Sequence, residues 1–445
     1  MTAWWFEHLW PGAGEVRAGM VVDVDNGLIT RVESDAAGVP AGSERVLGLT
    51  VPGLANTHSH AFHRALRSRT QQGSGDFWAW RERMYDVAAR LEPDGYFALA
   101  RGVFAEMACA GITAVGEFHY LHHRLDGRSY DDANAMAMAL VGAAAEAGLR
   151  LTLLDTCYLE SAPGRPVERG QLRFADASAS AWAERAGELA RRCSGTPHVR
   201  VGAAVHSVRA VPPAAISAVV DWASARAAPL HAHLSEQVAE NAACLAAYGR
   251  TPAQLLFDRG ALGPRTTVVH ATHLDAADIQ LLGSTGTGVC YCPTTERDLA
   301  DGLPLAREQA NAGAPISLGS DSNAVIDLFE EARGLEGNER LRTQLRGHFG
   351  AAELMTAATA TGQRALGWDG GRIEVGARAD FVTVRLDSVR TAGGGATLDA
   401  VAFAASAADV DQVVVDGRTV VRAGHHVGVP DVAQALRIEI ERLLA

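Results

Sequence analysis

The 445-residue chain carries a net charge of −12 and is 48% hydrophobic, which is ordinary for a globular protein with one large domain or a few smaller ones. Its acidic residues are spread along the chain, which argues against a nucleic acid or an anionic membrane as a partner. No apolar run is long enough to cross a membrane, and the N-terminus lacks the basic residues of a secretion signal. We therefore expect a cytoplasmic protein.

Two residue types limit the chemistry further. All 40 basic residues are arginines, so no lysine can form a Schiff base, serve a phosphate loop or bridge two metal ions in carboxylated form. The six cysteines are scattered and lack the spacing of a zinc finger or of a disulfide framework, so we expect reduced thiols. Cys290 and Cys292 can in principle bind a soft metal, but buried strand residues are the simpler interpretation.

Both ends of the chain have the pattern of short strands separated by turns. Residues 20–24 and 28–32 flank the turn Asp25-Asn26-Gly27, and residues 379–384 and 411–421 have a similar texture near the other end. We expect one small β-sandwich domain built from residues 1–50 and 371–445. Two unrelated β appendages are the alternative.

Between these ends, strand-like runs alternate with helical ones. Residues 93–110 begin with proline and precede Gly111, and residues 131–147 precede Gly148, as helices commonly do. Eight βα units within residues 51–370 predict a (β/α)8 barrel, whose active site lies at the C-terminal ends of its strands. An open doubly wound sheet is the alternative, although no Gly-x-Gly-x-x-Gly follows an early strand. The predicted strands are residues 51–60, 112–119, 150–158, 198–207, 229–235, 266–272, 287–293 and 315–321.

Polar side chains that suit metal binding stand at the ends of six predicted strands. The spacing of His58 and His60 places both imidazoles on one face of a strand, where they can reach one metal ion. With His233 and Asp321 they supply the nitrogen and oxygen ligands that a catalytic zinc takes, leaving a position for water. His231 is an alternative to His233, because alternate residues of a strand share a face. The other strand-end groups are Glu117, His119, Tyr120, His206 and His270.

The same residues suggest a hydrolytic chemistry. A metal ion brings the pKa of water from 15.7 to roughly 7, after which a carboxylate must relay protons and the leaving amine must receive one. Asp321 and Glu236 suit these tasks, and His270 would polarise the substrate or orient the nucleophile. A structural histidine is the alternative reading of His270. Fe²⁺ or Mn²⁺ would also fit such a His/carboxylate site.

The run His58-Ser59-His60-Ala61-Phe62, taken with His233, His270 and Ser320-Asp321, resembles the amidohydrolase superfamily in its branch of mononuclear zinc aminohydrolases. The β-rich ends, including residues 376–381, are similar to the composite β-sandwich domain of that superfamily. The resemblance spans nearly the whole chain. It implies an amidohydrolase-type barrel with one zinc ion per chain.

Within that branch, residues 77–85, 117–123 and 206–210 resemble the formimidoylglutamate deiminase family of histidine degradation. That family hydrolyses N-formimino-L-glutamate to N-formyl-L-glutamate and ammonia, so the implied substrate is a small dicarboxylate. Carried over residue by residue, the resemblance assigns zinc to His58, His60, His233 and Asp321, catalysis to Glu236, His270 and Asp321, and substrate contacts to Arg81, Tyr120, His206 and Arg209.

Arg81 and Arg209 make chemical sense as clamps, because guanidinium groups recognise carboxylates with paired hydrogen bonds. A surface or loop ion pair is the alternative for each. His63 stands where the family usually has glutamine, and its imidazole can still donate a hydrogen bond to the substrate. Trp78 and Trp80 belong either to the core or, as we favour, to a loop within residues 61–92 that closes over the site.

Other functions remain open. A related aminohydrolase acting on a purine, pyrimidine or triazine would favour stacking surfaces over two arginine clamps. A catalytically silent scaffold would tend to lose metal ligands, whereas a full set is present here. We expect a homodimer, since this is a common state among soluble enzymes.

Overall fold

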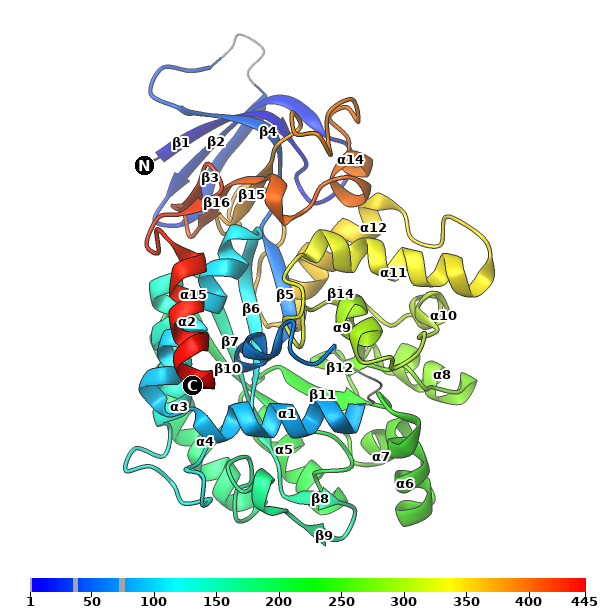
Figure 1. Ribbon diagram of the computed structural model, residues 1–445. Coiled ribbons are helices and arrows are strands. Elements are labelled where there is room, and N and C mark those ends of the chain that lie inside the picture. Colours follow the sequence, from blue (N-terminus) through cyan, green and yellow to red (C-terminus); the bar gives the residue numbers. More distant parts are fainter. Residues whose placement is uncertain (1, 35–38, 72–76) are drawn as a thin grey trace.

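The computed structural model describes residues 2–34, 39–71 and 77–445, and the side chains of residues 77–79 are not described. A β domain lies at one end of the molecule and a barrel surrounded by helices forms the rest (Figure 1). Among the described residues, no helix combines the length and the apolar character that a membrane span requires.

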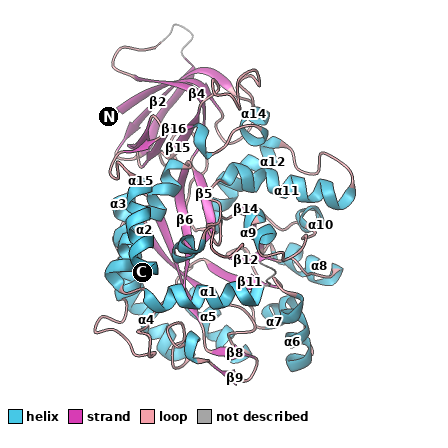
Figure 2. Cartoon of the chain, viewed as in Figure 1, coloured by secondary structure: helices cyan, strands magenta, loops and turns pink. Residues whose placement is uncertain are grey.

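The β domain is one eight-stranded sheet to which both ends of the chain contribute (Figure 2). Its strands follow the order β18-β17-β16-β15-β4-β1-β2-β3, and β4 joins the two halves by pairing with β1 and with β15. Trp4 and Phe6 each meet Phe381 edge to face with ring centroids 5.2 Å apart, so the small core of this domain also draws on both ends. The predicted composite β domain is confirmed. Its strands are β1 (Thr2–Leu9), β2 (Arg17–Asp25), β3 (Leu28–Ser34), β4 (Glu44–Pro52), β15 (Phe381–Val384), β16 (Val410–Val415), β17 (Arg418–Arg422) and β18 (His425–His426).

Eight parallel strands form the barrel, and they fall within the eight predicted segments. The first and last strands meet where the Ser320 amide donates to His58 O at 3.1 Å and the His60 amide donates to Asp321 O at 3.0 Å. The predicted (β/α)8 barrel is confirmed. Its strands are β5 (Leu54–Ser59), β6 (Ile112–His119), β7 (Arg150–Cys157), β10 (Val199–Val205), β11 (Leu230–Leu234), β12 (Thr266–His270), β13 (Gly288–Tyr291) and β14 (Ile316–Leu318).

One predicted strand is in fact two. Val51 and Pro52 belong to β4 of the β domain, and the barrel begins at Leu54. Gly53 stands between the two strands, and its amide donates to Asp380 O at 2.9 Å. A Cβ at this position would lie 2.3 Å from Thr113 Oγ1 of β6. Only glycine permits such a close approach. The chain therefore passes from one sheet into the other without a loop.

Helices follow the barrel strands, and the main hydrophobic core lies between the two layers. Of the two helices predicted by their caps, one is α2 as expected, and the other, α3, starts four residues later than predicted because residues 131–134 form a bend and turn. The helices after the early strands are α2 (Pro93–Cys109), α3 (Ala135–Ala147), α4 (Ala179–Cys193), α5 (Pro213–Ala225), α6 (Val238–Tyr248), α7 (Pro252–Asp258) and α8 (Ala276–Thr285). The later ones are α9 (Pro293–Asp298), α10 (Ala306–Asn311), α11 (Leu328–Thr343), α12 (Ala351–Thr356), α13 (Gly362–Ala365) and α14 (Leu398–Phe403).

The last helix, α15 (Val432–Leu444), packs against α2 of the barrel (Figure 1). A Cβ at Gly102 of α2 would lie 3.0 Å from Leu436 Cδ2, so the two helices approach closely. The buried Arg150 at the start of β7 also reaches into the β domain, where it donates to Asp380 at 2.7 Å. The two parts of the molecule are thus joined by apolar and ionic contacts.

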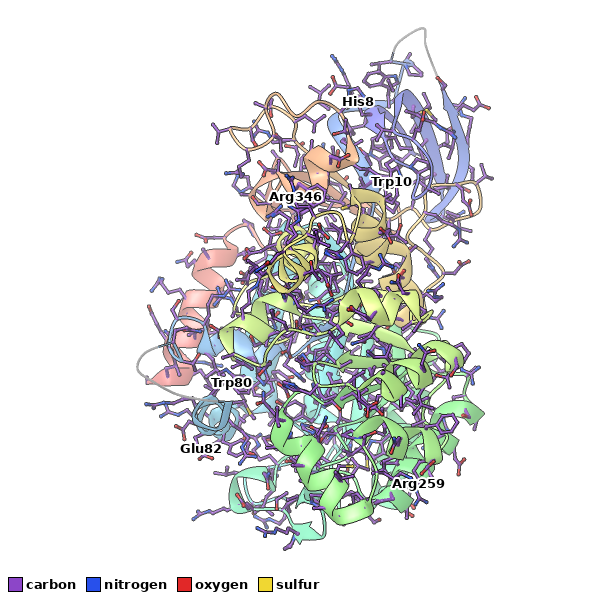
Figure 3. The ribbon with its side chains drawn as sticks, turned by 90° about the vertical axis from the view of Figure 1, so that its right-hand side faces the viewer. His8, Trp10, Trp80, Glu82, Arg259 and Arg346 are labelled. Carbon is purple, nitrogen blue, oxygen red and sulfur yellow. The ribbon has the colours of Figure 1, made fainter. Side chains whose placement is uncertain are left out.

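The segment expected to be a loop over the site is largely helical. A 3₁₀ helix, η1 (Ala61–Leu66), follows β5, and the α-helix α1 (Phe77–Arg90) precedes α2. Met84, Val87 and Ala88 are buried on one face of α1, which is the helical spacing that the sequence interpretation overlooked. Trp80 is half-buried on the inner side of α1 whereas Glu82 is exposed (Figure 3), and the side chain of Trp78 lies outside the described part of the chain.

Candidate active site

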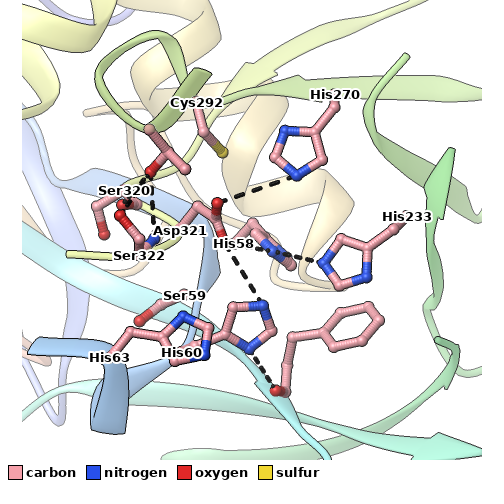
Figure 4. A network of polar contacts seen from close by, with 12 residues as sticks. His58, Ser59, His60, His63, His233, His270, Cys292, Ser320, Asp321 and Ser322 are labelled. Atoms are coloured by element: carbon pink, nitrogen blue, oxygen red, sulfur yellow. Dashed lines mark hydrogen bonds and ion pairs between the residues drawn. The ribbon is translucent and has the colours of Figure 1, made fainter. Parts of the chain in front are cut away.

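The C-terminal ends of the barrel strands bring four metal-competent side chains together. His58, His60, His233 and Asp321 are all buried, and each offers one ligand atom within 4.8 Å of the others. They come from β5, the residue after it, β11, and the turn after β14 (Figure 4). His231, the alternative to His233, lies elsewhere and places its Nε2 3.0 Å from Ala365 O.

Hydrogen bonds orient two of the three imidazoles. His60 Nδ1 lies 2.9 Å from Phe118 O, and His233 Nδ1 lies 2.9 Å from His206 O. A carbonyl oxygen only accepts, so Nδ1 carries the proton in both rings and Nε2 keeps its lone pair toward the centre. Burial lowers the pKa of His58, His60 and His233, which favours the neutral form that binds metals.

The spacing of these atoms fits a metal ion. His58 Nε2 lies 3.2 Å from His233 Nε2 and 3.2 Å from Asp321 Oδ1, and His60 Nε2 lies 3.4 Å from the same oxygen. Ligands about 2.0 Å from a tetrahedral zinc ion are about 3.3 Å from one another. Three nitrogens and one carboxylate oxygen are also the donor set of a hydrolytic metal site. The chain therefore has a His/His/His/Asp group suited to one metal ion.

The backbone around Asp321 is shaped to bring its carboxylate to this centre. Asp321 has a φ of +41°, and a Cβ at the nearby Gly319 would lie 2.8 Å from His58 O. Asn56 accepts from the Ser320 amide at 2.9 Å and ties the turn to β5. Burial opposes ionisation of Asp321, but the contact with His58 Nε2 and the positive charge favoured on His270 hold the pKa of its carboxyl below the usual range.

Glu236 and His270 stand beside the metal group. His270 Nε2 lies 3.9 Å from Glu236 Oε1 and 3.9 Å from Asp321 Oδ2. Burial raises the pKa of Glu236 to about 7. Burial opposes protonation of His270, but the neighbouring carboxylates outweigh it and raise the pKa of His270 well above the ordinary value. His270 has a φ of +69°, and Ser235, before Glu236, has a φ of +49°. Strained backbone of this kind clusters at functional sites.

A pocket opens above these groups, and all five predicted substrate-contact residues line it. Arg81 comes from α1, where its guanidinium lies 5.5 Å from the centre of the Tyr85 ring, and Arg209 lies 3.5 Å from Glu240. His63 Nε2 lies 2.9 Å from the Tyr120 hydroxyl. The five residues are His63, Arg81, Tyr120, His206 and Arg209, and the same pocket reaches Glu236, His270 and Asp321.

Sequence reasoning missed several lining residues. Tyr158 directly follows β7, so the strand-end rule that found His206 and His270 could have found it. Met84 and Tyr85 lie three and four residues after Arg81 on α1, which places them on its face once the segment is recognised as a helix. Phe174 and Leu299 also line the pocket, and nothing in their local sequence signals it.

Two predicted strand-end groups do not line this pocket. Glu117 accepts from the Ala61 amide at 2.6 Å, and burial raises the pKa of its carboxyl to about 8. The His119 ring meets the His122 ring with centroids 4.8 Å apart. Cys290 and Cys292 are buried free cysteines outside the metal group; Cys290 lies in β13 as predicted, whereas Cys292 follows the strand and caps α9.

Comparison with known proteins agrees with this geometry. Residues 49–420 match the Amidohydrolase family. The formimidoylglutamate deiminase of Pseudomonas aeruginosa is 37% identical over 416 residues, which cover 91% of this chain and 91% of that protein. An amidohydrolase from Brucella melitensis has a crystal structure that matches with a TM-score of 0.93, 32% identity and full coverage of both chains.

A more distant structure shares the fold. It is an adenosine deaminase from Xanthomonas campestris with bound zinc, which matches with a TM-score of 0.87 and 24% identity over all of this chain and 98% of its own. The family match extends over most of the chain and includes every residue of the metal group. The chain therefore belongs to the amidohydrolase family.

Proposed function

We propose that this protein is a zinc-dependent N-formimino-L-glutamate deiminase, which releases ammonia and N-formyl-L-glutamate. The observation that carries the proposal is that Arg81 and Arg209 line the same pocket as the metal group. A substrate with two carboxylates and a hydrolysable formimino group requires this combination. The likeness to the deiminase of Pseudomonas aeruginosa supports the same substrate.

The metal-binding residues would be His58, His60, His233 and Asp321. A metal ion held there would lower the pKa of water from 15.7 to roughly 7 and so supply a nucleophile at neutral pH. We favour zinc because zinc commonly takes imidazole and carboxylate ligands, and the four residues that supply them here lie together. The carboxylate of Asp321, kept ionised by the nearby histidines, would accept the proton that the attacking water loses.

Glu236 would carry the second proton. Its pKa of about 7 lets the carboxyl gain and lose a proton near neutral pH, which is the property of an effective acid-base group. As the water oxygen bonds to the formimino carbon, the C=N double bond would become single and its nitrogen would take up the proton that Asp321 accepted from the water. Protonated Glu236 would then deliver a further proton to that nitrogen, so that the C–N bond breaks and ammonia leaves. The hydroxyl proton of the adduct would pass to Glu236 as the formyl C=O forms, which returns both carboxyl groups to their starting states.

His270 would act on the negative charge that develops during attack. Its Nε2 faces the pocket between Glu236 and Asp321, at 3.9 Å from each carboxylate. A positively polarised N–H aimed at the reacting group stabilises this charge more in the transition state than in the ground state. His270 thus complements the proton transfers of the two carboxylates.

The remaining lining residues would hold the substrate. Arg81 and Arg209 would each pair with one carboxylate. His63 and Tyr120, already joined by a 2.9 Å contact, would lie beside the formimino group with His206. Burial lowers the pKa of His63 to about 3, so its imidazole is neutral at physiological pH, like the glutamine usual at this position.

A second candidate is an aminohydrolase that acts on a purine or another flat ring. Trp80, Tyr85, Tyr158 and Phe174 line the pocket and offer aromatic faces for stacking. Such a ring would offer neither Arg81 nor Arg209 a substrate carboxylate. Ring substrates should therefore tolerate the loss of both arginines, whereas the dicarboxylate should not.

The deciding experiment measures ammonia release by the zinc-loaded protein from N-formimino-L-glutamate, with N-formimino-L-aspartate, guanine and cytosine as comparison substrates. Turnover of the glutamate derivative, with little from the shorter derivative or the rings, would support the proposed reaction and both arginine contacts. Release from the ring compounds alone would reject the proposed substrate. No turnover with stoichiometric zinc bound would also reject it.

A further inference from the structure

A buried carboxylate stands on the far side of His270 from the pocket. Glu296 lies in the first turn of α9, directly after β13, and its side chain is fully buried. Its Oε1 accepts from the Cys292 amide at 2.9 Å and faces His270 Nδ1 at 3.4 Å. Glu296 does not line the pocket, so it cannot contact a substrate there.

The two nitrogens of His270 therefore have different surroundings. Nδ1 faces Glu296, and Nε2 faces Glu236 and Asp321. A carboxylate oxygen beside Nδ1 selects the ring orientation in which this nitrogen donates away from the pocket. The opposite nitrogen is then directed at the place where the reaction would occur.

The backbone of His270 makes such support important. His270 and Ala271 have φ values of +69° and +50°, a left-handed conformation that non-glycine residues adopt rarely. This turn carries the imidazole out of the strand and over the metal group, where its ring stacks on that of His233 at 5.7 Å. Among its described neighbours, Glu296 is the hydrogen-bond partner that faces Nδ1.

We propose that Glu296 is a positioning residue, whose carboxylate oxygen accepts a hydrogen bond from His270 Nδ1 and thereby aims Nε2 into the pocket. The inference rests on the role of His270 in the proposed function. Glu296 itself touches neither the reacting atoms nor the metal group. The required property is an acceptor oxygen at this position, anchored by the Cys292 amide.

A purely structural role at the start of α9 is the competing explanation, and the chain offers a matched control. Glu331 of α11 is also fully buried and accepts from the Thr294 amide at 2.9 Å, two residues before Glu296. It fastens the same turn, yet no contact joins it to His270 among the described interactions. Loss of Glu331 should therefore disturb α9 without removing the support of His270.

The test compares Glu296→Met, Glu296→Gln and Glu331→Gln in the zinc-loaded enzyme. Methionine keeps the volume but removes the acceptor, so kcat should fall on the order of 10- to 100-fold while KM and zinc content stay near the wild-type values. Glutamine retains an amide oxygen that can accept from both Nδ1 and the Cys292 amide, so kcat should stay within a few-fold of wild type. Glu331→Gln should lower Tm and leave kcat of the folded enzyme within a few-fold.

Crystal structures of the variants provide a readout that does not depend on the substrate. In Glu296→Met the His270 ring should turn from its wild-type orientation, and in the other two variants it should not. An unturned ring in Glu296→Met, or wild-type kcat in that variant, would overturn the inference. If methionine prevents folding, Glu296→Ala replaces it with the same criteria. A wild-type enzyme inactive on N-formimino-L-glutamate would reject the proposed function, while the ring orientation would still decide the role of Glu296.

Discussion

The Nε2 atoms of His58 and His233 lie 3.2 Å apart, although 175 positions separate the two residues in the chain. Burial keeps both rings neutral, and the Nδ1 proton of His233 is committed to a carbonyl oxygen. The Nε2 atom of His233 therefore presents its lone pair to His58. A metal ion shared by the two rings would fit this contact, because it accepts electron density from both nitrogens.

Metal binding should therefore depend on His233 and not on its neighbour in the same strand. His233→Asn should lose bound zinc and activity together, because one of four ligands is removed. His231→Asn is the matched control, because His231 faces Ala365 O and not the metal group. This variant should keep its zinc even if its Tm falls. Zinc per chain, measured by plasma mass spectrometry, tests both variants. Zinc retained by His233→Asn at the wild-type level would contradict the assignment.

Removal of the metal should also lower stability. A ligand that binds only the folded state at 1,000 times its Kd adds about 4.1 kcal/mol to the free energy of unfolding. The chelated wild-type protein should thus melt at a lower temperature than the zinc-loaded one, and zinc should restore the Tm. The effect should vanish in His233→Asn, which serves as the control for direct effects of the chelator. Equal Tm values for the loaded and chelated wild type would count against a tightly bound ion.

Glu236 should be needed for turnover but not for metal binding. Glu236→Gln keeps the shape of the side chain and removes its ability to carry a proton, so kcat should fall by about 10²- to 10⁴-fold. Zinc content should remain at the wild-type level, because Glu236 is outside the group of four ligands. Steady-state kinetics with metal analysis on the same sample makes the measurement. Unimpaired kcat in this variant would remove Glu236 from the mechanism.

The two arginines should set the preference for a dicarboxylate. Arg81→Ala and Arg209→Ala should each lower kcat/KM for N-formimino-L-glutamate roughly 10- to 100-fold, the equivalent of one charged hydrogen-bonded contact. Arg83→Ala is a matched control on the same helix, because Arg83 is exposed and is not among the pocket-lining residues. The kinetics should separate the first two variants from the third. Equal values for Arg81→Ala and Arg83→Ala would leave Arg81 without a role in binding.

The strand-end positions explain why so much of the barrel and of the centre could be predicted. Six of the eight predicted barrel strands are runs that end in a polar group suited to metal binding, and parallel strands bring such ends to one face, as with His58 and His233. This pattern could not identify Glu296, because Glu296 does not stand at the end of a strand but lies within the short helix α9. It also misread α1, because the helical face of Met84 and Val87 was taken for a loop. The helical spacing of α1 was present in the local sequence, whereas only the tertiary contact with His270 places Glu296.

Stability should fall as the pH rises, because of Glu117. This carboxyl is fully buried, and burial raises its pKa to about 8 from an ordinary value of 4.5. The folded state therefore holds its proton over a range in which the unfolded state has lost it. Below about pH 4.5 this group contributes its full share to the free energy of unfolding. That contribution, on the order of a few kcal/mol, is lost as the pH rises toward 8.

Glu117→Gln isolates this effect. Glutamine is neutral at every pH and its amide oxygen can still accept from the Ala61 amide, the contact that Glu117 makes at 2.6 Å. The variant should therefore gain Tm relative to wild type progressively between about pH 5 and pH 8, with little difference at pH 5. Thermal melts of both proteins in one set of buffers of constant ionic strength provide the comparison. A Tm difference between the two proteins that stays constant from pH 5 to pH 8 would contradict this prediction. A raised pKa of Glu117 in the folded state necessarily makes that Tm difference depend on pH.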